Sequence, residues 1–84
     1  MENLKKRLVG QNVRIYIDVI DDPDAWFDVQ VIDFVTSDGV INAVADVLAV
    51  GAQVHAPHVG GIELFALDAS TSIRSIPAEG GPYR

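Results

Sequence analysis

The dipeptide Asp38-Gly39 constrains the fold of this chain more than any other feature. It lies between two runs rich in β-branched and aromatic residues, one from Trp26 to about Thr36 and one from Val40 onward. An Asp-Gly pair in this setting is the strongest short-range signal for a β-hairpin, because a tight turn between twisted strands needs residues that accept positive φ angles. The sequence therefore predicts two consecutive antiparallel strands in the middle of the chain.

The segment that follows the turn is ambiguous, because its apolar residues also fit a helix. The positions with helical spacing are Ile41, Val44, Ala45, Leu48 and Ala49, and alanine favours helices. We expect a strand through about Val50 instead. The turn requires an antiparallel partner for the preceding strand, and Gly51 stands where a second turn is due.

Alternation of apolar and polar residues predicts a strand on the N-terminal side of the hairpin. Its apolar positions are Val13, Ile15, Ile17 and Val19, which is the period of a half-buried strand. The run from Trp26 to Thr36 changes phase instead, since Val29 and Val31 have the opposite parity to Ile32 and Phe34. A bulge that bends the strand would explain the change.

The remaining segments are shorter. We expect a helix over residues 2–9, where Asn3 can cap the start and Gly10 the end. The composition of residues 55–61 predicts a loop, and Ile62, Leu64 and Ala66 alternate with Glu63 on a fourth strand. A short fifth strand is expected from Ile73 to Ile76, ended by Pro77. The fold class is thus mainly β: a short N-terminal helix and a strongly bent, five-stranded antiparallel small barrel over residues 1–76. Residues 77–84 are expected to be a disordered tail.

The size of the chain predicts self-association. At 84 residues without cysteine, it has a thin stability margin and no disulfide or thiolate metal site to reinforce it. Oligomerisation is the remaining route to a larger core. The longest apolar run, Val47 to Ala52, is too short to cross a bilayer, so we expect a soluble, cytoplasmic protein.

Charge is distributed unevenly. The net charge is −6, and no Lys or Arg occurs between Ile15 and Ile73. This acidic body repels phosphate groups, which supply most of the non-specific affinity for nucleic acids. A nucleic-acid site would therefore have to use the N-terminal segment, Arg74 or uncharged contacts.

The order of elements and one local pattern resemble the Sm-like (LSm) family of small barrels. Residues 8–15, Leu-Val-Gly-Gln-Asn-Val-Arg-Ile, are similar to that family's helix exit and first strand, L-x-G-x-x-V-x-V. The segment Ile73 to Ile76 is similar to the closing strand of its second motif. The Arg-Gly pair of base-binding members falls on Ala69 and Ser70 here. The PRC-type barrel, which also starts with a Leu-x-Gly-x-x-Val strand and a hairpin, is the alternative fold.

The resemblance implies a homo-oligomeric ring in which the fourth strand of one subunit pairs with the fifth strand of the next. The implied interface residues are Ile62, Leu64, Ala66, Ile73 and Ile76. By position, two loops would line the pore and could contact single-stranded RNA or DNA through Thr36, Ser37, Asp38, Ser70 and Thr71. Arg74, Lys5 and Lys6 are the basic residues expected to assist them.

Other candidate sites have simpler interpretations. The acidic group of Asp18, Asp21, Asp22, Asp24 and Asp28 does not have EF-hand spacing, so we interpret it as a solvated turn that could recruit a basic protein. His55 and His58 form an H-x-x-H pair that could bind zinc only with a third ligand. Either Trp26 or Phe27 must point away from the core, where it could contact a base or a neighbouring subunit.

No pattern of residues predicts catalysis, a metal or a cofactor. Without cysteine, a nucleophile would be Ser or Thr beside a histidine, and none has that context. We therefore expect a non-enzymatic protein. The first hypothesis is a ring with weak nucleic-acid binding, and the second is a structural or adaptor ring whose acidic surface binds a basic protein.

Overall fold

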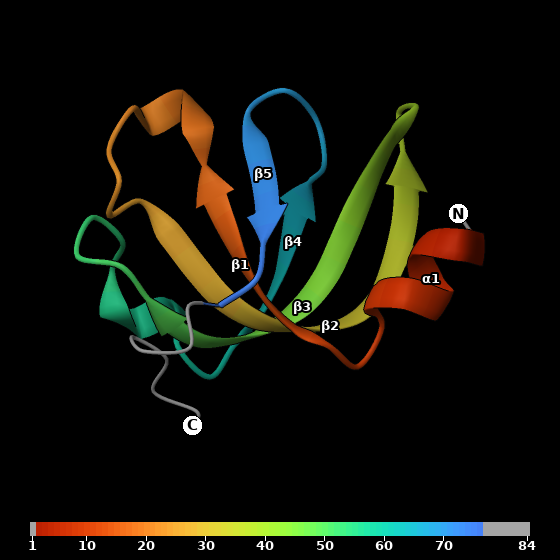
Figure 1. Ribbon diagram of the computed structural model, residues 1–84, viewed down its shortest axis with the longest axis horizontal. Coiled ribbons are helices and arrows are strands. Elements are labelled where there is room, and N and C mark those ends of the chain that lie inside the picture. The colour runs from red at the N-terminus through yellow and green to blue at the C-terminus, as the bar shows by residue number, and fades with distance from the viewer. Residues whose placement is uncertain (1, 77–84) are drawn as a thin grey trace.

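The computed structural model describes residues 2–76. Figure 1 shows a short helix beside a strongly curved sheet of five antiparallel strands in the order β4-β3-β2-β1-β5. The elements are α1 (Glu2–Leu8), β1 (Asn12–Ile17), the 3₁₀ helix η1 (Asp18–Ile20), β2 (Trp26–Ser37), β3 (Val40–Val50), the 3₁₀ helix η2 (Ala56–His58), β4 (Ile62–Ala66) and β5 (Thr71–Arg74). The predicted fold class, mainly β with one short N-terminal helix and five antiparallel strands, is confirmed. The tail predicted over residues 77–84 lies outside the described residues.

The central hairpin forms as the Asp-Gly pair predicts. Ser37 pairs with Val40 across the turn, and both turn residues have positive φ angles, 52° at Asp38 and 77° at Gly39. Residues 40–50 form a strand and not a helix, because they pair along β2 on one side and β4 on the other. The expectation of a strand ending near Val50 is confirmed.

Two irregularities bend β2. The pairing of β2 with β3 shifts register between Asp28 and Val29 and again between Val31 and Asp33. The second shift accounts for the phase change in the sequence: Ile32 is 45% exposed, whereas Phe34, two residues further on, is 2% exposed. The predicted bulge is confirmed, and it lets one long strand contribute to both halves of the curved sheet.

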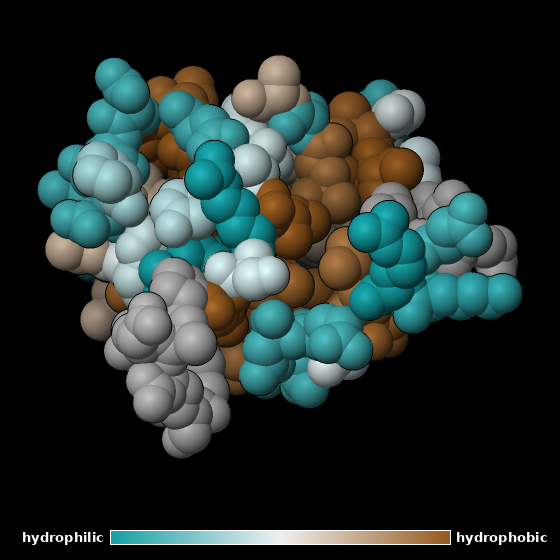
Figure 2. All heavy atoms as spheres, viewed as in Figure 1, coloured by the Kyte–Doolittle hydropathy of each residue, from teal (hydrophilic) through white to brown (hydrophobic). Residues whose placement is uncertain are grey.

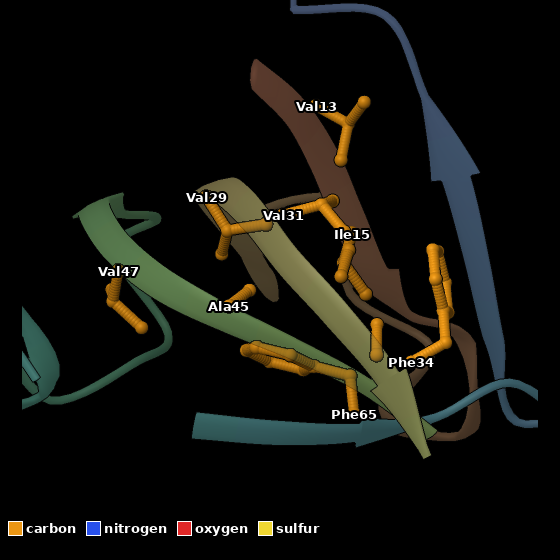
Figure 3. Packing of buried hydrophobic residues seen from close by; sticks show 9 residues of the cluster. Val13, Ile15, Val29, Val31, Phe34, Ala45, Val47 and Phe65 are labelled. Carbon is orange, nitrogen blue, oxygen red and sulfur yellow. The ribbon is translucent and has the colours of Figure 1, made fainter. Parts of the chain in front are cut away.

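The core lies on the concave side of the sheet. Figure 3 shows its side chains converging from β1, β2, β3 and β4. The buried apolar residues of this cluster are Val13, Ile15, Val29, Val31, Phe34, Ala43, Ala45, Val47 and Phe65. Phe27 packs edge-on against Phe65, with ring centroids 4.9 Å apart. Two alanines on β3 leave room for the phenylalanines of the neighbouring strands.

Two predicted boundaries are wrong. β1 ends at Ile17, and Val19 lies in η1 with 73% of its surface exposed. The amides of Asp18 and Val19 both donate to the carbonyl oxygen of Ser70, which takes the chain out of the strand. β5 begins at Thr71 and ends at Arg74, earlier than predicted, because Thr71 pairs with Ile17 on β1. Ile76 therefore follows β5 and is not part of it.

Candidate functional site

Both ends of the sheet are unpaired within the described residues. β4 pairs on one side with β3, and β5 pairs on one side with β1. Each strand therefore presents a row of backbone N–H and C=O groups that another strand can pair with. Either edge could therefore extend the sheet with a strand of another polypeptide.

The β4 edge also exposes large apolar side chains. Leu64 is 61% exposed and Ile62 is 58% exposed. Leu64 pairs with Val44, which lies between the buried residues Ala43 and Ala45. Since side chains alternate along a strand, Val44, Leu64 and Ile62 lie on the outer face of the sheet, the face opposite the core. Figure 2 shows that hydrophobic residues from several parts of the domain reach the surface between hydrophilic ones in the view of Figure 1.

A surface hollow lies beside the C-terminal end of β1 and the segment that follows it, with Arg74 of β5 on its border; we call it the β1 hollow. Its volume is about 460 Å³, and it is lined by Tyr16, Ile17, Asp18, Asp21, Asp22, Pro23 and Arg74. The Arg74 guanidinium lies over the Tyr16 ring, 5.1 Å from its centroid. Tyr16 lies two residues after Arg14 on β1, and Arg74 on β5 is the cross-strand partner of Arg14. Tyr16 and Arg74 therefore lie on the outer face, with Arg14. The carboxylates of Asp18, Asp21 and Asp22 make the lining of the hollow acidic.

The outer face of β1 and β2 holds a buried ion pair that sequence reasoning missed. Arg14 and Asp28 are direct cross-strand partners, and Nε and Nη2 of Arg14 donate to the two carboxylate oxygens at 2.6 and 3.0 Å. Trp26 covers the guanidinium at 3.6 Å from its ring centroid. Asp28 is 0% exposed and Arg14 is 8% exposed. The hydrogen bonds to Asp28 raise the pKa of Arg14 above its ordinary value, although burial acts in the opposite direction.

The ion pair changes the interpretation of two sequence features. Asp28 lies in β2 outside the acidic turn, and it neutralises Arg14 on the neighbouring strand β1. Trp26, one of the two candidates for an exposed aromatic, is half-buried over that pair, while Phe27 packs against the core. The available signal was the hairpin register of β1 and β2, which places an arginine opposite an aspartate.

The polar loop residues proposed to contact nucleic acid lie at one end of the molecule. In Figure 1, the end of β2 with Thr36 and Ser37, the turn with Asp38 and the β4–β5 connection with Ser70 are all at the top. The β4–β5 connection is beside η1, whereas the β2–β3 turn is on the opposite side of the view. The second loop is fixed by internal hydrogen bonds. The amide and hydroxyl of Ser70 donate to Asp68, and the Thr71 hydroxyl donates to the carbonyl of Ala66. These bonds lower the pKa of Asp68, first through the Ser70 hydroxyl.

The basic residues expected to assist them lie on α1 and β5. Lys5 on α1 is within 3.4 Å of Asp33 on β2, and Lys6 is exposed on the same helix. The pKa of Asp33 is lowered, mainly because its carboxylate accepts a hydrogen bond from the Phe34 amide and secondarily because of Lys5. Arg74 is on the edge strand β5. These three cations are therefore not gathered around one groove: Lys5 lies beside Asp33 on β2, whereas Arg74 lines the hollow with Asp18.

The two histidines have different surroundings. His58 Nδ1 is 3.1 Å from Glu63 Oε1, and its ring is edge-on to Phe27, whereas His55 is exposed. Over residues 2–76, no three side chains of His, Cys, Asp or Glu come together as a set of metal ligands. In the same part of the chain, no helix has the length and hydropathy to cross a membrane.

The residues proposed for a subunit interface occupy different environments. Ile62, Leu64 and Ala66 belong to the β4 edge and Ile73 to the β5 edge, where it packs partly against the core. Ile76 lies beyond β5.

No protein-family model, curated protein or solved structure matches this chain.

Proposed function

We propose that this protein is a non-enzymatic, Sm-like scaffold that assembles head to tail and presents an acidic surface to a basic protein partner. In the proposed assembly, β4 of one copy pairs with β5 of the next. The observation that carries the proposal is the pair of sheet edges that are unpaired within residues 2–76, of which the β4 edge exposes Ile62 and Leu64. An exposed apolar edge strand on a monomer is an aggregation hazard, and closed head-to-tail assembly removes it.

The charge distribution favours a protein partner over nucleic acid. The polar loops share their end of the domain with Asp18, Asp38 and Asp68. Lys5 is paired with Asp33, and Arg74 lines the hollow together with three carboxylates. Repetition around an assembly would multiply this negative field, which attracts basic segments and repels phosphates. The uncharged residues Thr36 and Ser37 at the end of β2 and Thr71 at the start of β5, which the sequence placed in loops, keep single-stranded nucleic acid as the second candidate.

The hydroxyl groups support a non-enzymatic role. Ser70 and Ser72 donate to Asp68 and Asp18, and Thr71 donates to a backbone carbonyl. Each hydroxyl hydrogen thus serves a loop or strand contact, and none of these acceptors is a histidine that would act as a general base.

Edge-blocked variants test the head-to-tail arrangement. A β4-blocked variant carries Ile62→Asp and Leu64→Asp, and a β5-blocked variant carries Ser72→Asp and Arg74→Asp. All four positions are exposed or half-buried on the outer face, so we expect both variants to keep the wild-type circular dichroism spectrum. In light scattering the wild type should give a mass of several subunits, each variant alone a monomer, and their mixture a heterodimer.

The mixing result separates the arrangements. If the β5-blocked variant dimerises alone, two β4 edges pair symmetrically and the head-to-tail proposal is wrong. A wild-type mass of 9.0 kDa would exclude assembly altogether. For the partner, fluorescence anisotropy with a labelled lysine-rich peptide should show saturable binding that weakens with salt. Saturable binding of uridine-rich or adenine-rich oligonucleotides, without peptide binding, would instead favour the nucleic-acid candidate.

A further inference from the structure

The β1 hollow carries an excess of negative charge. The carboxylates of Asp18, Asp21 and Asp22 line it beside one guanidinium, that of Arg74. Among the side chains that the structure describes, no basic residue forms an ion pair with any of these three carboxylates. The hollow therefore keeps an unbalanced negative charge, which attracts a cation and repels an anion.

The acidic segment that lines the hollow is held in place by hydrogen bonds. The Ile17 amide donates to the carbonyl oxygen of Ala25 at 2.9 Å, which closes the loop between β1 and β2. The Asp18 carboxylate accepts a hydrogen bond from the Ser72 hydroxyl on β5, and the Asp22 carboxylate accepts one from the backbone amide two residues later. A cation that binds here meets carboxylates that are already positioned, which reduces the entropic cost of binding.

The aromatic wall of the hollow indicates which cation fits. The Tyr16 ring already carries a guanidinium, that of Arg74, 5.1 Å from its centroid. On the same face of the sheet, Arg14 lies between the Trp26 ring and the Asp28 carboxylate, which it binds through two hydrogen bonds. A guanidinium is planar, stacks on aromatic rings and binds carboxylates in a bidentate manner, whereas an ammonium is a strongly hydrated point charge. An aromatic ring beside carboxylates therefore suits an arginine better than a lysine.

We propose that the β1 hollow binds an arginine side chain of the basic protein partner, with its guanidinium at the three carboxylates and its alkyl stem along Tyr16. This inference rests on the acidic-surface function proposed above and names the residue type that the surface recognises. The volume of about 460 Å³ is within the range of pockets that enclose small ligands. The hollow lies on the side of β5 that pairs with β1, so pairing of β4 with the free edge of β5 would leave it open.

Arg74 opposes the binding of a second cation in the hollow. Its guanidinium has the same charge as the incoming arginine and lies over the Tyr16 ring that the arginine would contact. Removing this charge should therefore strengthen the binding of a basic peptide. It should weaken the binding of a nucleic acid, which would use Arg74 to contact phosphate. The sign of the effect of Arg74→Gln thus separates the two classes of partner.

Fluorescence anisotropy with two labelled peptides of equal length and charge tests the preference for arginine. One is a lysine-rich peptide, and the other is the same peptide with its central lysine replaced by arginine. We expect the arginine peptide to bind the wild-type protein roughly tenfold more tightly. Arg74→Gln should raise the affinity for the arginine peptide roughly threefold.

Asp21→Asn tests the carboxylates. Asparagine keeps the shape of the side chain and tolerates the positive φ angle of 24° at this position, so the fold should be kept, as circular dichroism will show. The substitution should weaken binding of the arginine peptide roughly tenfold. Asp46→Asn, on β3 and outside the lining of the hollow, changes the net charge equally. As the matched control, it should weaken binding less than about twofold.

The contact with the aromatic ring is tested by Tyr16→Leu, with Tyr16→Phe as its matched variant. Phenylalanine keeps the ring face that stacks on a guanidinium, so the preference for the arginine peptide should persist. Leucine removes that face, and the two peptides should then bind with nearly equal affinity. Thermal unfolding of both variants measures any loss of stability, and a loss of stability alone would not remove the difference between the two peptides.

The outcomes distinguish this inference from the proposed function. If both peptides bind saturably but with equal affinity, and Asp21→Asn acts like Asp46→Asn, the acidic surface binds basic segments diffusely and the hollow proposal is wrong. Weaker peptide binding by Arg74→Gln would also overturn it. If neither peptide binds saturably at low salt, both proposals fail. Preference for arginine, lost in Tyr16→Leu and kept in Tyr16→Phe, supports the arginine site.

Discussion

Around the Arg14–Asp28 pair, both faces of β1 and β2 are buried, but by opposite chemistry. On the concave face, Ile15 and Val29 are 0% exposed within an apolar cluster. On the outer face, Asp28 is equally buried but holds Arg14 in a bidentate ion pair beneath Trp26. Apolar packing tolerates small changes in shape, whereas a buried charge depends entirely on its partner. The outer face is therefore the more fragile side of the same two strands.

The largest effect should follow from removing one member of the ion pair. Arg14→Ala leaves the Asp28 carboxylate buried without its counter-charge, and we expect a loss of about 3–5 kcal/mol in the free energy of unfolding. For a domain of this size that approaches the whole stability. Urea denaturation followed by Trp26 fluorescence and circular dichroism measures it.

A paired replacement sharpens the comparison. Arg14→Met with Asp28→Leu makes the outer face resemble the concave face, and it should be much less destabilising than Arg14→Ala, because no charge remains buried. If Arg14→Ala unfolds with wild-type stability, the ion pair does not anchor this face.

An intermediate effect on the free energy of unfolding is expected at Gly51, which lies against Trp26, the residue that covers the ion pair. A Cβ atom at this position would lie 2.8 Å from the Trp26 indole and would also collide with the backbone carbonyl oxygen of Asp24. Gly51→Ala should therefore displace Trp26 from Arg14 and cost about 1–3 kcal/mol, in the range of other overpacked sites. Denaturant unfolding and the emission maximum of Trp26 report the two consequences. Gly61→Ala is the control, since its nearest neighbour lies at ordinary contact distance, 3.5 Å.

The sequence was informative about the concave face and much less so about the outer one. The Asp38-Gly39 turn and the phase change at Ile32 predicted the hairpin and the bend of β2, because both are local consequences of backbone geometry. The Arg14–Asp28 pair depends on the register between strands, and alternation alone does not reveal whether the polar side of a strand faces water. It was therefore not predicted.

The candidate site was predicted only in part, for the same reason. Ile62 and Leu64 were recognised as edge residues from their alternation. The hollow of Tyr16 and Arg74 required knowledge of where β1 ends and where β5 begins, and the hydrogen bonds from the amides of Asp18 and Val19 to the Ser70 carbonyl lie at both boundaries. Such tertiary hydrogen bonds leave no local pattern in the sequence.

The smallest effect on stability is expected from replacing Asp68, whose carboxylate is exposed, in contrast to the buried carboxylate of Asp28. Hydrogen bonds from Ser70 hold the pKa of Asp68 below its ordinary value in the folded protein. A lowered pKa means that the folded state binds the proton less readily than the unfolded chain does. Asp68 therefore stabilises the fold above about pH 4, and this contribution disappears as the pH falls through the lowered folded-state value.

Asp68→Asn should accordingly lower the melting temperature slightly at pH 7, and the difference from wild type should shrink as the pH approaches 3. Thermal unfolding at a series of pH values measures this, with Asp38→Asn, at an exposed carboxylate in the β2–β3 turn, as the matched control. A pH-independent difference would mean that the asparagine disturbs the turn geometry rather than the charge. Since a carboxylate in water loses little when its partner is removed, the effect should remain far below that of Arg14→Ala, as the contrast between the exposed and the buried carboxylate requires.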